Sequence, residues 1–141
     1  MGYGLGSLLS LVVSLFARLV GLDRDRAFYP TVLIIVGSYY VLFAVMGGTT
    51  RDLIIELIGI AAFVVAAVVG FKFNSWIVAA GLVGHGVFDF FHAGLVANAG
   101  VPVWWPAFCM SYDVGAGICL AWLLWRGRKT AIGLPRRKRR I

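Results

Sequence analysis

The chain has 141 residues, of which 61% are hydrophobic and 13% are charged. Soluble globular domains carry roughly 45–50% apolar and about 25% charged residues, so this composition excludes an ordinary water-soluble domain. The formal charge of +7 resides at the C-terminus, because eight of the thirteen basic residues fall within residues 126–141. The apolar residues form long runs, which predicts an all-α polytopic membrane protein with a single domain.

Five apolar runs are long enough to form membrane helices, at about residues 5–22, 29–46, 53–71, 75–98 and 107–125. The first run carries a narrow polar stripe made of Ser7, Ser10, Ser14, Arg18 and Gly21. This stripe fits either the packing face of a spanning helix or the wet face of a helix that lies on the membrane. We therefore expect five transmembrane helices, or four plus an N-terminal interfacial helix, and the length of the run favours five.

The second and third runs are joined by residues 47–50, Gly-Gly-Thr-Thr, which predict a tight turn. Thr50 is expected to be the N-cap of the third helix, and Pro30 fits the first turn of the second helix. The third run contains one charge, Glu56, on a face of mostly small residues that suits close helix packing.

The fourth run contains three ionisable residues, His85, Asp89 and His92, at spacings of four and three. On a helix with about 100° per residue, their side chains lie within about 40° of one another. An Asp near the middle of a membrane costs about 2.5–3.5 kcal/mol on insertion scales, so such groups normally face protein or water. This stripe is therefore the expected centre of a functional site.

An uncharged loop with Trp104 and Trp105 precedes the fifth run, which carries Asp113 and, one turn earlier, Cys109. The expected substrate-binding residues around the cluster are Trp104, Trp105, Tyr112, Tyr40 and Cys109. Each also has a structural interpretation. Tryptophans anchor loops at the lipid headgroups, tyrosines pack at interfaces, and a membrane cysteine commonly serves as a small apolar filler.

The distribution of basic residues predicts the orientation, since cytoplasmic loops are enriched in Lys and Arg. The basic tail, residues 126–141, is expected in the cytoplasm, where it would bind anionic membrane lipid and not nucleic acid. Counting back, the 99–106 loop lies outside and Lys72 lies inside, and the other connections agree. We therefore expect an integral, multi-pass protein of a bacterial-type cytoplasmic membrane.

This orientation places the membrane carboxylates in the outer half of the bilayer. At 1.5 Å per residue, Glu56, Asp113 and Asp89 lie about 6, 10 and 13 Å from the outer ends of their helices. His92 and His85 lie about 9 and 20 Å from the outer end of theirs. Isolated carboxylates at these depths are costly. We therefore expect them to be clustered, and then protonated, paired or metal-bound.

The expected metal ligands are His92, His85, Asp89, Asp113 and Glu56, a donor set that suits zinc, iron or manganese. Bundles that bind two metals carry two carboxylate-x-x-His motifs, whereas this chain has one, so a mononuclear site fits better. Without a metal, the expected catalytic groups are Asp89, Asp113 and His85, acting as acid and base. The structural alternative is a polar ladder that only holds the helices together.

These patterns favour a small integral-membrane enzyme with an outward-facing metal or acid–base site that acts on a lipid-like or apolar substrate. Two other classes stay open on the sequence alone. One is an auxiliary subunit that uses the polar cluster to bind a partner membrane subunit or a cofactor. The other is a small proton- or ion-coupled transporter, which would be a homo-oligomer because so few helices enclose little space.

Overall fold

The computed structural model describes residues 1–133, which form five long helices and one short 3-10 turn. The helices are α1 (Gly2–Val20), α2 (Phe28–Gly47), α3 (Thr50–Lys72), α4 (Ser75–Leu95) and α5 (Trp105–Gly133), with η1 (Leu22–Arg24) between α1 and α2. All five helices are long and apolar enough to cross a membrane. The predicted all-helical, multi-pass membrane bundle is therefore confirmed.

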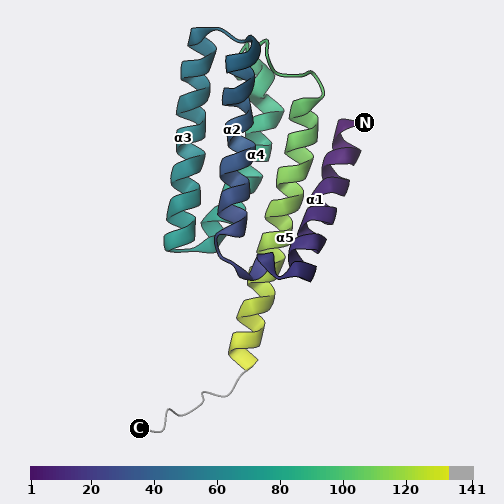
Figure 1. The fold of residues 1–141 in the computed structure, drawn as a ribbon. Coiled ribbons are helices and arrows are strands. Elements are labelled where there is room, and N and C mark those ends of the chain that lie inside the picture. The colour runs from purple at the N-terminus through teal and green to yellow at the C-terminus, as the bar shows by residue number, and fades with distance from the viewer. Residues whose placement is uncertain (134–141) are drawn as a thin grey trace.

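The helices run alternately up and down, with α2, α3 and α4 packed together, α5 packed against α4, and α1 on the outer side of α5 (Figure 1). We call the end that carries the N-terminus, the α2–α3 turn and the α4–α5 loop the site end. The opposite end, which carries η1 and the α3–α4 turn, is the tail end. The C-terminal part of α5 extends past the bundle there (Figure 1).

Helix α1 packs through small residues, since its buried positions are Gly6, Ser10 and Ala17. Its leucines and valines are largely exposed around the rest of the helix, as expected for side chains in contact with lipid. The helix lies along α5 within the height of the bundle (Figure 1). This arrangement fits a fifth spanning helix, and the small-residue face is the packing face.

The N-cap of α3 is Thr49, one residue earlier than the sequence predicted. Thr49 Oγ1 accepts a hydrogen bond from the backbone N–H of Asp52 at 3.2 Å. The Asp52 carboxylate in turn accepts one from the backbone N–H of Thr49 at 2.8 Å. This reciprocal capping box satisfies two otherwise free N–H groups, which explains why Thr49 caps the helix instead of Thr50.

Helix α4 ends earlier than predicted, and helix α5 begins earlier than predicted. The chain leaves α4 after Leu95, because Val96 adopts extended backbone angles and Asn98 turns back into the bundle. Helix α5 begins two residues earlier than predicted and continues to Gly133, so the first residues of the expected tail are helical. The basic run Arg136–Arg140, expected to bind anionic lipid, lies outside the described residues.

Candidate functional site

The buried face of α4 carries His85, Asp89 and His92, whose exposed fractions are 1%, 1% and 2%. All three point into the bundle, as their spacing on a helix predicts. Asp113 on α5 faces them with an exposed fraction of 0%. Four ionisable side chains are thus excluded from solvent and lipid inside the bundle.

A glycine lets α5 approach this part of α4 closely. A Cβ atom at Gly86 would lie 2.9 Å from Val114 Cγ2 and 3.0 Å from the carbonyl oxygen of Met110, both on α5. Any larger residue would push the helices apart next to His85. Small residues commonly permit such contacts between membrane helices, and here the contact brings Asp113 within reach of α4.

The imidazole of His85 lies between two carboxylates. Its Nδ1 is 2.6 Å from Asp113 Oδ2, a short hydrogen bond, and 3.5 Å from Asp89 Oδ2. The other Asp89 oxygen, Oδ1, accepts a hydrogen bond from the Tyr40 hydroxyl at 2.7 Å. One ring nitrogen is thus shared by carboxylates from two different helices.

Cys109 completes this group from one turn earlier on α5. Its thiol Sγ lies 3.6 Å from Asp113 Oδ2, and the residue is 2% exposed. One potential ligand atom from each of the four residues lies within 4.8 Å of the others. We call His85, Asp89, Cys109 and Asp113 the four-residue cluster.

Two carboxylate oxygens of the four-residue cluster are left without a hydrogen bond from residues 1–133, Asp89 Oδ2 and Asp113 Oδ1. Both atoms are buried. Nearly all buried polar atoms in native proteins have a hydrogen-bond partner, and a buried acceptor without one costs about 1–3 kcal/mol, or more when charged. These oxygens therefore have the capacity to bind a metal ion, a proton or a polar substrate atom.

A second buried group lies nearer the site end. His92 Nε2 is 2.8 Å from Glu56 Oε1 on α3. Asn98 donates to the same Glu56 oxygen at 3.0 Å and to the backbone carbonyl of Tyr40 at 3.2 Å. We call Glu56, His92 and Asn98 the upper group. It links α2, α3, α4 and the start of the α4–α5 loop.

Tyr40 connects the upper group to the four-residue cluster. Its ring stacks on the His92 ring with centroids 3.9 Å apart, while its hydroxyl donates to Asp89. The side chain is 1% exposed. Tyr40 therefore holds Asp89 in place from one side while its ring packs against the upper group.

The structure divides the five predicted metal ligands between two places. His85, Asp89 and Asp113 belong to the four-residue cluster, whereas His92 and Glu56 pair with each other. Of the predicted substrate-binding residues, Tyr40 lies in the buried centre, and Trp105, Cys109 and Tyr112 line one cavity. Trp104, the last residue of the loop before α5, is 57% exposed.

Sequence reasoning missed Asn98 and did not include Cys109 among the expected metal ligands. Asn98 was assigned to the end of α4, although an amide side chain that closes an apolar run is itself a signal of a buried hydrogen bond. The sequence places Cys109 among the expected substrate-binding residues, and its spacing of one helical turn from Asp113 predicts that the two side chains face the same way. The structure brings these two side chains into contact.

Comparisons with protein-family models, with curated proteins and with solved structures gave no match to this chain.

Proposed function

We propose that the protein is a small integral-membrane enzyme in which the four-residue cluster binds one divalent transition metal ion. The observation that carries this proposal is the placement of four buried donor atoms within 4.8 Å of one another. The two carboxylate oxygens without hydrogen bonds, described above, support it. A metal ion would offset the negative charge of Asp89 and Asp113, which is otherwise costly inside a membrane.

The distances in the cluster are compatible with a tetrahedral site. Zinc bonds of about 2.0–2.3 Å to nitrogen, oxygen and sulfur put neighbouring ligand atoms roughly 3.3–3.7 Å apart. Nδ1 of His85 lies 3.5 Å from Asp89 Oδ2, and Sγ of Cys109 lies 3.6 Å from Asp113 Oδ2. The 2.6 Å contact between His85 and Asp113 has to lengthen, which replacement of its proton by a metal would bring about, and donor atoms as much as 4.8 Å apart have to move closer together.

The donor set favours zinc or iron over manganese. One imidazole nitrogen and two carboxylate oxygens suit all three metals, but a thiolate selects softer ions. A pure cysteine–histidine nucleophile is less well supported, because the thiol of Cys109 contacts the Asp113 carboxylate and not the imidazole. Metal ligation gives all four groups a role.

Catalytic zinc sites commonly have three protein ligands and one exchangeable position. Cys109 is the member of the cluster that also lines a cavity, whereas His85, Asp89 and Asp113 are enclosed between helices. We assign these three as the permanent ligands and Cys109 as the group that water or substrate displaces. The bound ion would act as a Lewis acid and would lower the pKa of a water molecule bound to it.

The surrounding residues would set the position of the ligands. Tyr40 fixes one oxygen of Asp89 through its 2.7 Å hydrogen bond, which turns the other oxygen toward His85. Hydrogen bonds of this kind orient metal ligands and tune their affinity. A metal-free acid–base site would use the same residues, with His85 and Asp113 sharing the proton.

The site would face the outside of the cell. Arg24, Arg26 and Lys72 all lie at the tail end, whereas Arg51 is the basic residue at the site end. By the positive-inside rule the tail end is cytoplasmic. The cluster would then lie in the outer half of the membrane, in reach of substrates from the bilayer or from its outer surface.

The buried side chains between the cluster and the tail end argue for an enzyme over a transporter. They include Leu33, Val78 and Leu82, each 0% exposed and part of the apolar core. An ion pathway needs polar groups across the whole membrane. Within the described chain, no buried Asp, Glu or His lies closer to the tail end than His85, and the buried ionisable residue beyond it is Tyr29.

The proposal is tested by the metal content of the purified full chain, measured in the wild type and in a matched pair, His85→Gln and His92→Gln. Both histidines lie on α4, both are buried, and both contact a carboxylate. Only His85 belongs to the four-residue cluster. We expect about one metal ion per chain in the wild type and in His92→Gln, and a loss of at least tenfold in affinity in His85→Gln.

Two results would contradict the metal proposal. One is a wild-type protein that binds no zinc, iron or manganese when these ions are supplied during purification. The other is an equal loss of metal in both variants, which would mean that the cluster defined above is not the binding site.

A further inference from the structure

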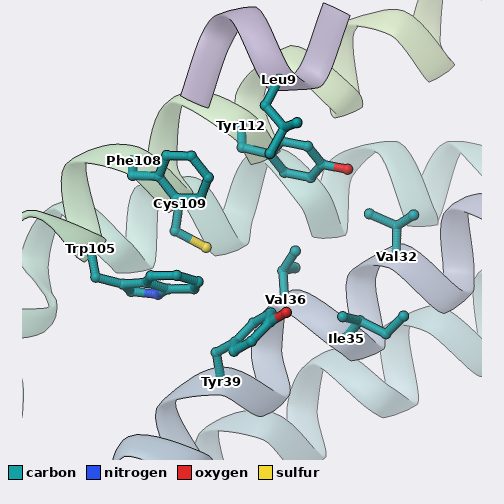
Figure 2. A pocket seen from close by; sticks show the side chains of 9 residues that line it. All are labelled: Leu9, Val32, Ile35, Val36, Tyr39, Trp105, Phe108, Cys109 and Tyr112. Carbon is teal, nitrogen blue, oxygen red and sulfur yellow. The ribbon is translucent and has the colours of Figure 1, made fainter. Parts of the chain in front are cut away.

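A cavity of about 400 Å³ lies between α1, α2 and α5, next to the four-residue cluster (Figure 2). It falls within the size range of small-molecule sites, about 300–1,000 Å³. Its walls are formed by nine side chains from the three helices: Leu9, Val32, Ile35, Val36, Tyr39, Trp105, Phe108, Cys109 and Tyr112.

The mouth of this cavity opens sideways, toward the lipid. Helix α1 packs against α5 and η1, whereas within the described residues its backbone does not come close to that of α2. Side chains of the two helices meet nearer the tail end, where Ser14 interacts with Tyr29. Leu9 on α1 and Ile35 on α2 are 42% and 49% exposed. A molecule dissolved in the bilayer could therefore enter between these two helices without passing through water.

The inner wall of the cavity reaches the four-residue cluster. Cys109 points its sulfur toward the α2 side of the space (Figure 2), and that sulfur lies 3.6 Å from Asp113 Oδ2. A molecule that fills the cavity would thus have one end beside Cys109, the metal ligand that we expect substrate to displace.

The polar atoms of the lining indicate what kind of ligand fits. None of the nine residues carries a charge. Their polar groups are the hydroxyls of Tyr39 and Tyr112, the thiol of Cys109 and the indole N–H of Trp105. The indole nitrogen has no hydrogen-bond partner among residues 1–133 and is itself buried, so a ligand oxygen would reach it after a small rotation of the ring. These groups can donate to an oxygen acceptor, but no cation is present to balance a phosphate or carboxylate.

We propose that the cavity binds the hydrocarbon chain of an uncharged lipid taken laterally from the bilayer, with an ester or carbonyl oxygen of that lipid held near Trp105 and Cys109. This inference deepens the proposed function and rests on it for its catalytic meaning. Binding in the cavity is nevertheless measurable without any metal, so the two proposals fail separately.

The test uses a monoacylglycerol with a photoreactive diazirine in its acyl chain, added to the purified full chain in lipid nanodiscs, with and without prior removal of metal by a chelator. After irradiation, the labelled residues are located by mass spectrometry. We expect labelling of cavity residues such as Phe108 to fall at least tenfold when excess unlabelled monoacylglycerol is present. Labelling of lipid-facing residues such as Val65, which is 61% exposed, should fall little.

A matched pair of variants on α2 locates the binding. Ile35 lines the mouth of the cavity and is 49% exposed, whereas Leu42, two turns along the same helix, is 48% exposed and does not line it. Ile35→Trp should fill the mouth and reduce the competable labelling of Phe108 at least fivefold. Leu42→Trp should leave it unchanged.

Three outcomes would overturn this inference. The first is labelling of Phe108 that does not respond to unlabelled monoacylglycerol, which would mean contact with bulk lipid only. The second is equal competable labelling of Phe108 in Ile35→Trp and in Leu42→Trp. The third is equal competition, in the metal-free protein, by the monoacylglycerol phosphate of the same chain, since none of the lining side chains is cationic. Competable labelling that survives metal removal would support the cavity even if the metal proposal failed.

Discussion

Asp113 on α5 and His85 on α4 are joined by a 2.6 Å contact between Oδ2 and Nδ1, with both side chains essentially excluded from the surface. Two groups 28 positions apart in the chain are thereby fixed at one point between two membrane helices. Separating a buried pair of this kind leaves an uncompensated charge, at a typical cost of about 3–5 kcal/mol. The pair is therefore both a structural contact and the centre of the candidate site.

The close approach of α4 and α5 predicts that Gly86→Ala is destabilising. Its Cβ would meet Val114 Cγ2 at 2.9 Å and a backbone oxygen at 3.0 Å, and overpacking of this kind costs about 1–3 kcal/mol. The control is Gly84→Ala, where a Cβ meets nothing within 4 Å and helix propensity favours alanine by about 1 kcal/mol. Thermal unfolding in detergent measures both. Equal melting temperatures would show that the helices do not approach as described.

Tyr40→Phe is expected to weaken metal binding without removing the ring. The substitution deletes the 2.7 Å hydrogen bond to Asp89 but keeps the stacking on His92. Loss of a group that orients a metal ligand typically reduces affinity about 10–100-fold. Tyr39→Phe, on the cavity side of the same helix, should leave the affinity unchanged. Zinc titration with a chelator competitor compares the two, and unaltered affinity in Tyr40→Phe would contradict the assignment of Asp89 as a ligand.

Asn98→Ala should destabilise the bundle at its site end. The amide group makes two buried donor contacts, to Glu56 and to the Tyr40 carbonyl, and its oxygen accepts from the backbone N–H of Gly100 at 3.1 Å. Leaving such groups unpaired costs about 1–3 kcal/mol each. Asn74→Ala, which removes an exposed N-cap, should cost about 1 kcal/mol. If Asn98→Ala lowers the free energy of unfolding no more than Asn74→Ala does, the hydrogen bonds assigned to the upper group are wrong.

The orientation proposed from the basic residues is checked by labelling. Val103 in the α4–α5 loop is 99% exposed, so Val103→Cys should react with a membrane-impermeant thiol reagent added outside intact cells. A reporter fused after Ile141 should be active only in the cytoplasm. If residue 103 reacts only after the membrane is opened, the orientation is the opposite of the one proposed, and the cluster lies in the inner half of the bilayer.

The sequence predicted the helices and the shared face of α4 well, because apolar run length and helical spacing are local properties. It placed His85 about 20 Å and Asp113 about 10 Å from the outer helix ends, since the ends themselves were misplaced. With α4 ending at Leu95 and α5 beginning at Trp105, the depths become about 15 and 12 Å. The two groups then lie within one turn of each other, which the contact between them requires.

The separation of the predicted ligands into two groups was beyond sequence reasoning. Glu56 and His92 pair because α3 lies against α4 at that height, and Asn98 joins them because the chain leaves α4 early. The lateral order of the helices decides such contacts, and apolar runs carry little information about it. The cavity beside Cys109 likewise exists because the α1 backbone lies close to α5 and farther from α2.

X-ray absorption at the zinc edge of the zinc-loaded protein tests the metal proposal most directly, with Cys109→Ser and Cys119→Ser as a matched pair. Both cysteines lie on α5 and are free thiols, but only Cys109 belongs to the cluster. We predict one sulfur at about 2.3 Å and nitrogen or oxygen ligands at about 2.0–2.2 Å, in the wild type and in Cys119→Ser. Cys109→Ser should keep the zinc and lose the sulfur. A first shell of oxygen alone in the wild type, or a sulfur that survives in Cys109→Ser, would contradict the account.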